Sequence, residues 1–126
     1  MLKIILIGLG GFFGAVARYA LSGLAHRWVS TSFPLGTLLV NVLGCVVMGG
    51  AMCLAEERQF FSPEARVLVL IGFLGSFTTF STFGFESFEM VRGRELLTAA
   101  WNVALHLTLG MGGVAAGWLA VRTLRI

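Results

Sequence analysis

The twelve residues Gly72–Phe83, GFLGSFTTFSTF, determine how the rest of the chain is interpreted. They lie inside an apolar stretch long enough to cross a membrane, yet they contain two glycines, recurring phenylalanines and the hydroxyls of Thr78, Thr79, Ser81 and Thr82. In a bilayer, an irregular backbone is tolerated only where protein buries it or where it lines a water-filled cavity. This stretch is therefore the first candidate for a functional site.

The composition indicates an all-α integral membrane protein. The chain has 126 residues, of which 57% are hydrophobic and 12% charged, and its mean hydropathy is +0.91. A soluble domain carries about 25% charged residues, so this chain has too little polar surface to cover a water-facing globule. The sequence contains no nucleophile–base pair, nucleotide-binding loop or metal-ligand cluster, which argues against an enzyme. Its basic residues are scattered singly, as interfacial anchors are, and form no patch for nucleic acid.

Four apolar segments approach the ~20 residues that a membrane-spanning helix needs. We therefore expect one domain, residues 1–126, with four transmembrane helices and a break in the third. The expected spans are 3–24, 35–55, 65–90 and 96–121. We expect a multi-pass protein of the bacterial inner (plasma) membrane.

The charges next to the spans scarcely specify an orientation. An even number of spans puts both termini on one side of the membrane. Five basic residues flank the spans on that side and four on the other, so the positive-inside bias is almost absent. The five are Lys3, Arg58, Arg66, Arg122 and Arg125, and the four are Arg18, Arg27, Arg92 and Arg94. The sequence thus permits insertion in both orientations.

Small residues recur at the spacing that lets membrane helices approach closely. The pairs are Gly10 and Gly14, Gly72 and Ser76, and Gly113 and Gly117. Much of this pattern suits packing within one chain, but its abundance also favours an oligomer. If copies insert both ways, the closed assembly that we expect is a twofold, antiparallel, dual-topology homodimer.

Two rows of side chains follow helical spacing along the third span. One contains phenylalanines and the other passes from hydroxyls at depth to carboxylates near the membrane edge. The first row is Phe73, Phe77 and Phe80, with Phe83 one turn beyond, and the second is Thr78, Thr82, Glu86 and Glu89, with Ser81 beside it. Phenylalanine at this spacing usually means packing, but a dry packing face has no need of the neighbouring hydroxyls.

Polar residues also share faces on the other spans. Asn41 lies about a third of the way into the second span, where an interhelical hydrogen bond and pore lining are equally good readings. His106 in the fourth span reads by itself as a satisfied core residue. Arg18 in the first either snorkels to the interface or holds an anion at a pore mouth. The second-span face is Thr37, Asn41 and Gly44, and the fourth-span face is Thr98, Asn102 and His106, continued by Gly110.

The polar groups at depth suit a small anion. Apart from Glu86 at the end of a span, no acidic residue lies at depth in the membrane, so the usual carboxylate of a proton- or cation-coupled exchanger is missing. Hydroxyl and amide N–H groups donate hydrogen bonds, and aromatic edges carry the positive part of the ring quadrupole. A fixed positive charge at mid-pore would bind an anion too tightly for rapid passage.

The chain resembles the Fluc/CrcB fluoride channels of microbes over essentially its full length. Three motifs carry the resemblance, and the third is the most specific in a four-span chain of this size. They are Gly10-Gly11 through Gly14 to Arg18-Tyr19, then Gly36–Gly44 (GTLLVNVLG), then Gly72–Gly75 (GFLG) leading into Thr78–Phe83 (TTFSTF).

The resemblance implies a fluoride-selective channel that exports fluoride passively and gives fluoride resistance. It also implies an antiparallel homodimer with two pores and a structural sodium ion at the dimer interface, bound by the backbone carbonyls of Gly75 and Thr78. The fluoride-lining residues would be Asn41, Phe80, Phe83, Ser81 and Thr82, and the vestibule residues Arg18 and Glu86.

Some positions depart from the family pattern, and two other functions stay open. Family members often have tyrosine or serine where this chain has Asn102, His106 and Gly110. A small dual-topology multidrug exporter would need a membrane-embedded glutamate in the first span, which this chain lacks. A structural membrane protein without transport would show no change of ion flux on substitution of Phe80 or Asn41.

Overall fold

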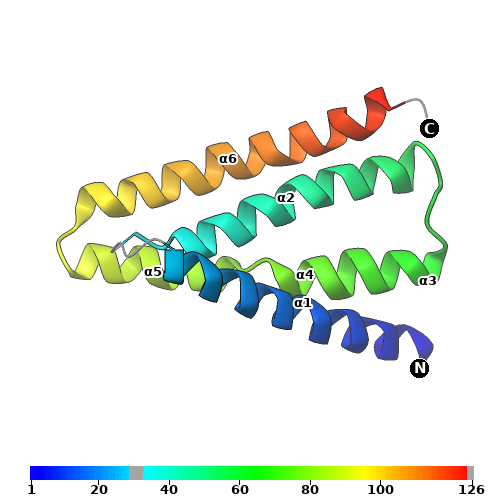
Figure 1. Cartoon of the computed structure of the whole chain (residues 1–126), viewed down its shortest axis with the longest axis horizontal. Helices are drawn as coiled ribbons and strands as arrows, with labels where there is room; N and C mark the ends of the chain where they lie inside the picture. Colours follow the sequence, from blue (N-terminus) through cyan, green and yellow to red (C-terminus); the bar gives the residue numbers. More distant parts are fainter. Residues whose placement is uncertain (29–32, 125–126) are drawn as a thin grey trace.

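The computed structural model describes residues 1–28 and 33–124, and these residues form four apolar helical spans with no strand (Figure 1). The first, second and fourth spans are single helices, whereas the third is divided. The helices are α1 (Leu2–Trp28), α2 (Leu35–Glu56), α3 (Pro63–Arg66), η1 (Val67–Leu74), α4 (Gly75–Phe77), α5 (Phe80–Arg92) and α6 (Leu96–Thr123). The expected fold class, an all-α membrane protein of four spans with a break in the third, is confirmed.

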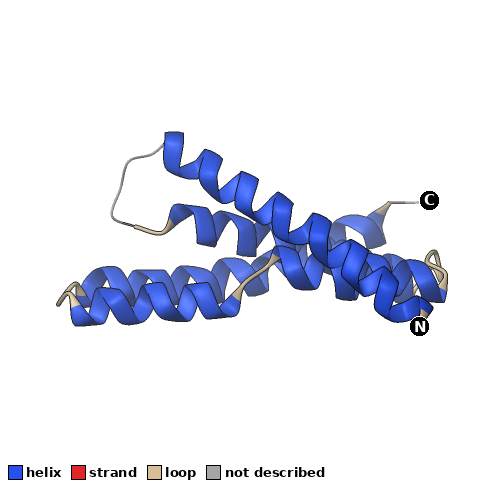
Figure 2. Cartoon of the chain, turned by 90° about the horizontal axis from the view of Figure 1, so that it is seen from below, coloured by secondary structure: helices blue, strands red, loops and turns tan. Residues whose placement is uncertain are grey.

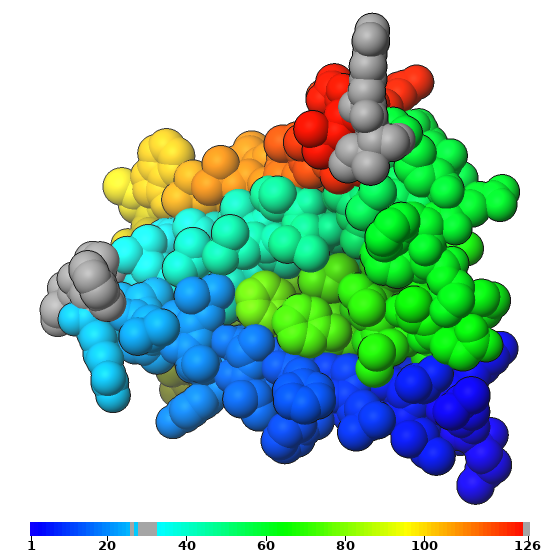
Figure 3. Space-filling view, turned by 45° about the vertical axis from the view of Figure 1, so that its right-hand side comes forward, coloured from blue at the N-terminus to red at the C-terminus, as the bar shows by residue number. Residues whose placement is uncertain are grey.

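The second span lies at the centre of the arrangement and is the most buried of the four. α2 packs along α6 on one side and against α1 on the other, while α1 packs on η1 and α4 (Figure 1). α5, beyond the break, packs mainly against α6. Figure 3 shows the face on which α1, α2 and the middle of the third span lie side by side at the surface.

Glycines allow α1 to touch the backbone of the third span. A Cβ added at Gly10 would meet the carbonyl oxygen of Leu68, and one added at Gly14 would meet the carbonyl oxygen of Phe73. The segment that they touch, η1, is a π-helix, a wider winding than the α-helix. Lipid provides no hydrophobic driving force for helices to associate, so close backbone packing of this kind holds them together instead.

Glycines also bring the backbones of α2 and α6 into contact. Gly49 lies against the backbone of Val114, and Gly117 lies against the backbone of Val46 and of Gly50. These glycines therefore pack spans of one chain together.

The break in the third span consists of two threonines (Figure 2). Thr78 has ψ 159°, and Thr79 has φ −148° and ψ 117°, so both backbones are extended. β-Branched residues favour this conformation. Thr79 then starts α5, because its side-chain oxygen accepts a hydrogen bond from the Thr82 N–H at 3.3 Å. Gly75 keeps helical angles, φ −63° and ψ −31°, so the chain leaves the helix after Phe77.

The prediction that Phe80 continues the row of Phe73 and Phe77 is wrong, because the row ends at the break. Phe73 and Phe77 stack with parallel rings 5.9 Å apart, and Phe77 is 8% exposed. Phe80, in contrast, is 82% exposed and pairs with Phe83 at 5.5 Å. The row assumed a continuous helix, and two extended residues change the direction in which the next side chains point.

Gly117→Ala should destabilise the fold, because the new methyl group would meet the Val46 backbone, which cannot move without shifting α2. We expect a loss of about 1–3 kcal/mol, the usual effect of overpacking. Gly112→Ala is the matched control on the same helix, since nothing lies within 4 Å of its added Cβ. It should leave stability unchanged or raise it by up to about 1 kcal/mol. Thermal unfolding in detergent measures both, and equal melting temperatures would contradict the packing described.

Candidate functional site

The Asn41 side chain bridges the break in the third span. Its Nδ2 donates to the Thr79 carbonyl oxygen at 3.0 Å, and its Oδ1 accepts from the Thr79 N–H at 2.8 Å. One amide therefore satisfies both backbone groups of a non-helical residue at membrane depth, where an unpaired group is costly. Of the two readings left open by the sequence, the interhelical hydrogen bond is present.

The rest of this face of α2 also follows the third span. Gly44, one turn from Asn41, lies opposite the methyl group of Thr78. Thr37, one turn in the other direction, donates its hydroxyl to Glu86 Oε1 at 2.7 Å. The polar face of α2 that helical spacing predicted thus contacts the third span on both sides of the break.

The break removes the helical partners of the carbonyl groups that precede it, and those of Gly75 and Thr78 are two of them. In a continuous α-helix the Thr79 N–H would bond to the Gly75 carbonyl, and the Thr82 N–H to the Thr78 carbonyl. Here the Thr79 N–H bonds to Asn41 and the Thr82 N–H to the Thr79 hydroxyl. The carbonyl oxygens of Gly75 and Thr78 are therefore left to other partners, as backbone oxygens that bind cations must be.

A cavity of about 280 Å³ lies beside the break, between α2, the start of α5 and α6. Its walls are mainly apolar, with a few polar groups directed into it. It is lined by Asn41, Gly44, Cys45, Met48, Thr78, Thr79, Phe80, Phe83, His106, Leu107 and Val114. Mostly apolar walls with a few donors and aromatic rings fit a small ion that has lost part of its water.

Hydroxyl groups cluster at the first turn of α5. The Thr79 hydroxyl donates to the Thr82 hydroxyl at 2.9 Å, and it lies 3.4 Å from the Ser81 hydroxyl. Ser81 and Thr82 are both exposed in this single chain. Since the cluster lies in the middle of a membrane span, it must face water or another protein surface.

A second polar chain attaches α5 to α6. Asn102, fully buried, donates to the Ser87 hydroxyl at 2.9 Å, and Ser87 donates to the Phe83 carbonyl at 2.8 Å. One turn along α6, the His106 ring lies 4.3 Å from the Phe83 ring. These contacts hold Phe83 at the wall of the cavity.

The structure brings together some of the predicted site residues and separates others. Asn41, Phe80 and Phe83 share the cavity, and Ser81 and Thr82 form the hydroxyl cluster beside it. Glu86 lies further along α5, outside the lining, and Arg18 is half-buried on α1, also outside it.

Two residues gained importance only from the structure. The sequence marks Thr79 only as one of four hydroxyl residues, but Asn41 binds its backbone groups, which no residue pattern reveals. His106 lies on the predicted polar face of the fourth span, which is the signal that marks it, and it lines the cavity.

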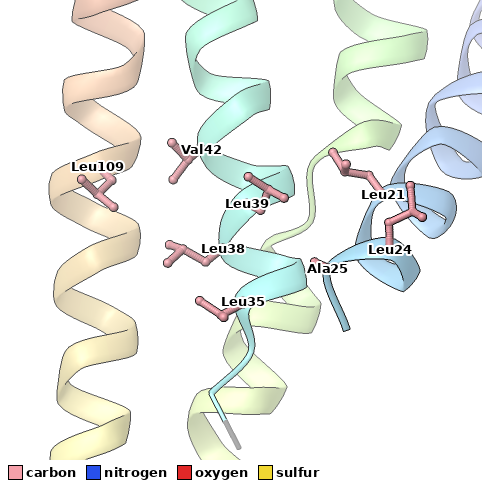
Figure 4. Close-up of a pocket in the computed structure, with 8 residues that line it drawn as sticks. All are labelled: Leu21, Leu24, Ala25, Leu35, Leu38, Leu39, Val42 and Leu109. Carbon is pink, nitrogen blue, oxygen red and sulfur yellow. The ribbon is translucent and has the colours of Figure 1, made fainter. Parts of the chain in front are cut away.

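A second, entirely aliphatic hollow offers no ion site. It has a volume of about 490 Å³ and lies between the end of α1, the start of α2 and α6 (Figure 4). Every side chain that lines it is aliphatic: Leu21, Leu24, Ala25, Leu35, Leu38, Leu39, Val42 and Leu109. Within residues 1–28 and 33–124, no cluster of three His, Cys, Asp or Glu side chains could hold a metal ion.

Comparison with known proteins gives a consistent result. Residues 5–118 match the family described as "CrcB-like protein, Camphor Resistance (CrcB)". A "fluoride-specific ion channel FluC" of Nitratidesulfovibrio vulgaris is 45% identical over 126 residues, covering 100% of this chain and 99% of the relative. FluC 1 of Methanosarcina acetivorans is 43% identical, covering 98% and 94%, and FluC of Nitrosococcus oceani is 46% identical, covering 92% and 93%.

Asn102→Ala should loosen the attachment of α5, because it removes the donor to Ser87 and leaves a cavity in a fully buried position. We expect a loss of about 2 kcal/mol or more. Thr108→Ala on the same helix is the control, since the exposed Thr108 hydroxyl bonds only to the Ala104 carbonyl of its own helix. Unfolding in detergent compares them, and a loss in Thr108→Ala as large as that in Asn102→Ala would contradict the role assigned to Asn102.

Proposed function

The chain belongs to the CrcB-like family and is a multi-pass membrane protein and a fluoride-selective channel; we propose that fluoride passes along the cavity beside the break in the third span. A channel of this kind transports an ion and catalyses no reaction. Export would be passive. Fluoride enters acidified cells as its neutral acid and dissociates inside, so the ion leaves down its gradient, and the cell becomes fluoride-resistant.

The main support for the proposed path is that uncharged hydrogen-bond donors and aromatic rings lie together at one point in the membrane. The Asn41 amide and the rings of Phe80 and Phe83 share the cavity, and the hydroxyls of Ser81 and Thr82 adjoin it. Ring edges and N–H and O–H donors stabilise an anion without a fixed positive charge. Fluoride can therefore replace lost water contacts yet still leave.

The exposure of this site supports an antiparallel homodimer. In one chain, Phe80 is 82% exposed and the hydroxyls of Ser81 and Thr82 lie uncovered within a span. Hydroxyls at this depth need a protein or water neighbour. A second copy in the opposite orientation would cover them and close the cavity, and the balanced basic residues at the span ends allow such inversion.

A structural sodium ion fits the carbonyl groups that the break releases. Gly75 and Thr78 each present an oxygen whose helical partner bonds elsewhere. Two copies related by a twofold axis would supply four such oxygens, and oxygen atoms are what a hard cation binds. When bound, the ion would offset the partial negative charge of these carbonyls at the dimer interface.

Arg18 and Glu86 fit the vestibules at the ends of the path. Glu86 lies on α5 beyond the cavity, and the Thr37 hydroxyl holds its carboxyl group at 2.7 Å. Arg18 lies on α1, half-buried. In the alternative function, a multidrug exporter, a glutamate would lie within the first span, and the sequence of α1 contains none.

Phe80→Ile should slow fluoride transport, because isoleucine keeps much of the apolar volume but offers no positive ring edge to the anion. We expect the initial rate of fluoride efflux from liposomes holding purified protein to fall about tenfold, equivalent to ~1.4 kcal/mol. A fluoride electrode measures the rate. Phe85→Ile is the control, since Phe85 is exposed on the same helix and does not line the cavity. If Phe80→Ile transports fluoride at the native rate, the proposed path is wrong.

A further inference from the structure

We infer that the aliphatic hollow between the end of α1, the start of α2 and α6 binds an acyl chain of an anionic phospholipid, and that Arg27 binds the phosphate group of the same lipid. This binding is independent of the proposed fluoride path, because the hollow and the path lie on different sides of α2. The lipid fills a gap that the side chains of three helices leave open in the membrane (Figure 4).

The hollow extends along α2 from the membrane edge inward. Its lining begins at Leu35, the first residue of α2, and reaches Val42, which lies about 10 Å further along the helix. Its volume is about 490 Å³, and every side chain that lines it is a hydrocarbon. Water finds no hydrogen-bond partner there, whereas an acyl chain gains dispersion contacts. Acyl chains of the bilayer lie roughly parallel to the spans, so one of them fits the hollow lengthwise.

The hollow lies on the side of α2 that faces away from the break. An α-helix turns about 100° per residue, so Leu35, Leu39 and Val42 project opposite to the polar face of α2. That polar face contacts the third span at the break, and Phe80 lines the cavity on the same side. The second copy proposed above would cover Phe80 and would therefore leave the hollow open to lipid.

Arg27 supplies a positive charge at the membrane edge beside the hollow. It follows Leu24, which lines the hollow, by three residues, and so lies on the same side of α1 one turn closer to the end of the span. Its side chain is exposed and makes no ion pair with a residue that the structure describes. A guanidinium group binds phosphate through two parallel hydrogen bonds, and basic residues beside a span attract anionic lipids.

Some other arginines at the ends of the spans are already paired within the chain. Arg92 pairs with Glu89 at 2.6 Å, and Arg122 pairs with Glu57 at 3.5 Å. Arg27 instead keeps its charge for a partner outside the chain. A phospholipid satisfies both features at once, since its phosphate group lies at the membrane edge and its acyl chain enters the hollow.

The test measures by native mass spectrometry how tightly the purified protein binds added phosphatidylglycerol. Arg27→Gln removes the charge, and Ala25→Phe fills the hollow with a ring. Each should raise the dissociation constant of the first phosphatidylglycerol about tenfold, because a charge-assisted hydrogen bond or the burial of an acyl chain is lost. The matched controls are Arg94→Gln, at the same membrane edge, and Ala20→Phe, exposed on α1 outside the hollow. Both should bind the lipid as the native protein does.

A second lipid tests the role of charge. Phosphatidylcholine with the same acyl chains should bind the native protein more weakly, because its choline group offsets the charge of the phosphate. Equal affinity for the two lipids would overturn the inference. Unchanged binding in Ala25→Phe, or an equal loss in Arg27→Gln and Arg94→Gln, would also overturn it.

The same spectra report whether a second copy of the chain covers the hollow instead. If the native protein is a dimer and Ala25→Phe is a monomer, the hollow belongs to the interface between copies, and the inference is overturned. If Ala25→Phe does not fold, Leu39→Phe takes its place with the same expectation, since Leu39 lines the hollow and is 40% exposed.

Discussion

The rest of this structure depends on the pair of hydrogen bonds between Asn41 and Thr79. A membrane span cannot stop being helical at mid-depth unless the backbone groups that it releases find partners. The amide of Asn41 is suited to this, because it donates to the Thr79 carbonyl and accepts from the Thr79 N–H. A leucine at position 41 could do neither. The break therefore depends on a residue of a different span, α2, which packs against every other span.

Several properties of the site follow from this one constraint. Because Thr79 bonds to Asn41, the carbonyl of Gly75 loses its helical partner, and because Thr79 caps α5, so does the carbonyl of Thr78. The same two extended residues separate buried Phe77 from exposed Phe80. One irregular point thus frees the carbonyl oxygens that we propose bind a cation and places the aromatic rings that we propose line the path of an anion.

The glycines and the polar residues have different tasks. Gly14 and Gly117 bring backbones together within one chain and account for the tight packing of the spans. The hydroxyls of Ser81 and Thr82 gain no such cover from their own chain. The proposed second copy would cover these hydroxyls and Phe80.

Much of the fold could be predicted from the sequence, because span length and hydropathy are local properties. The faces of the second and fourth spans were also predictable, since Thr37, Asn41 and Asn102 follow helical spacing. The course of the chain at Thr78 and Thr79 was not, because it depends on a bond to a residue 38 positions away. For the same reason, helical spacing wrongly placed Phe80 in one row with Phe73 and Phe77.

The central claim, that Asn41 holds the break, is tested most directly by hydrogen–deuterium exchange of peptides from Asn41→Ala and the native protein. We predict that the peptide containing Leu74–Thr82 exchanges about tenfold faster in Asn41→Ala, as expected for loss of roughly 1.4 kcal/mol of protection. Peptides from the middle of α6 should exchange at the native rate. Unchanged exchange at Leu74–Thr82, or equal acceleration throughout the chain, would contradict it.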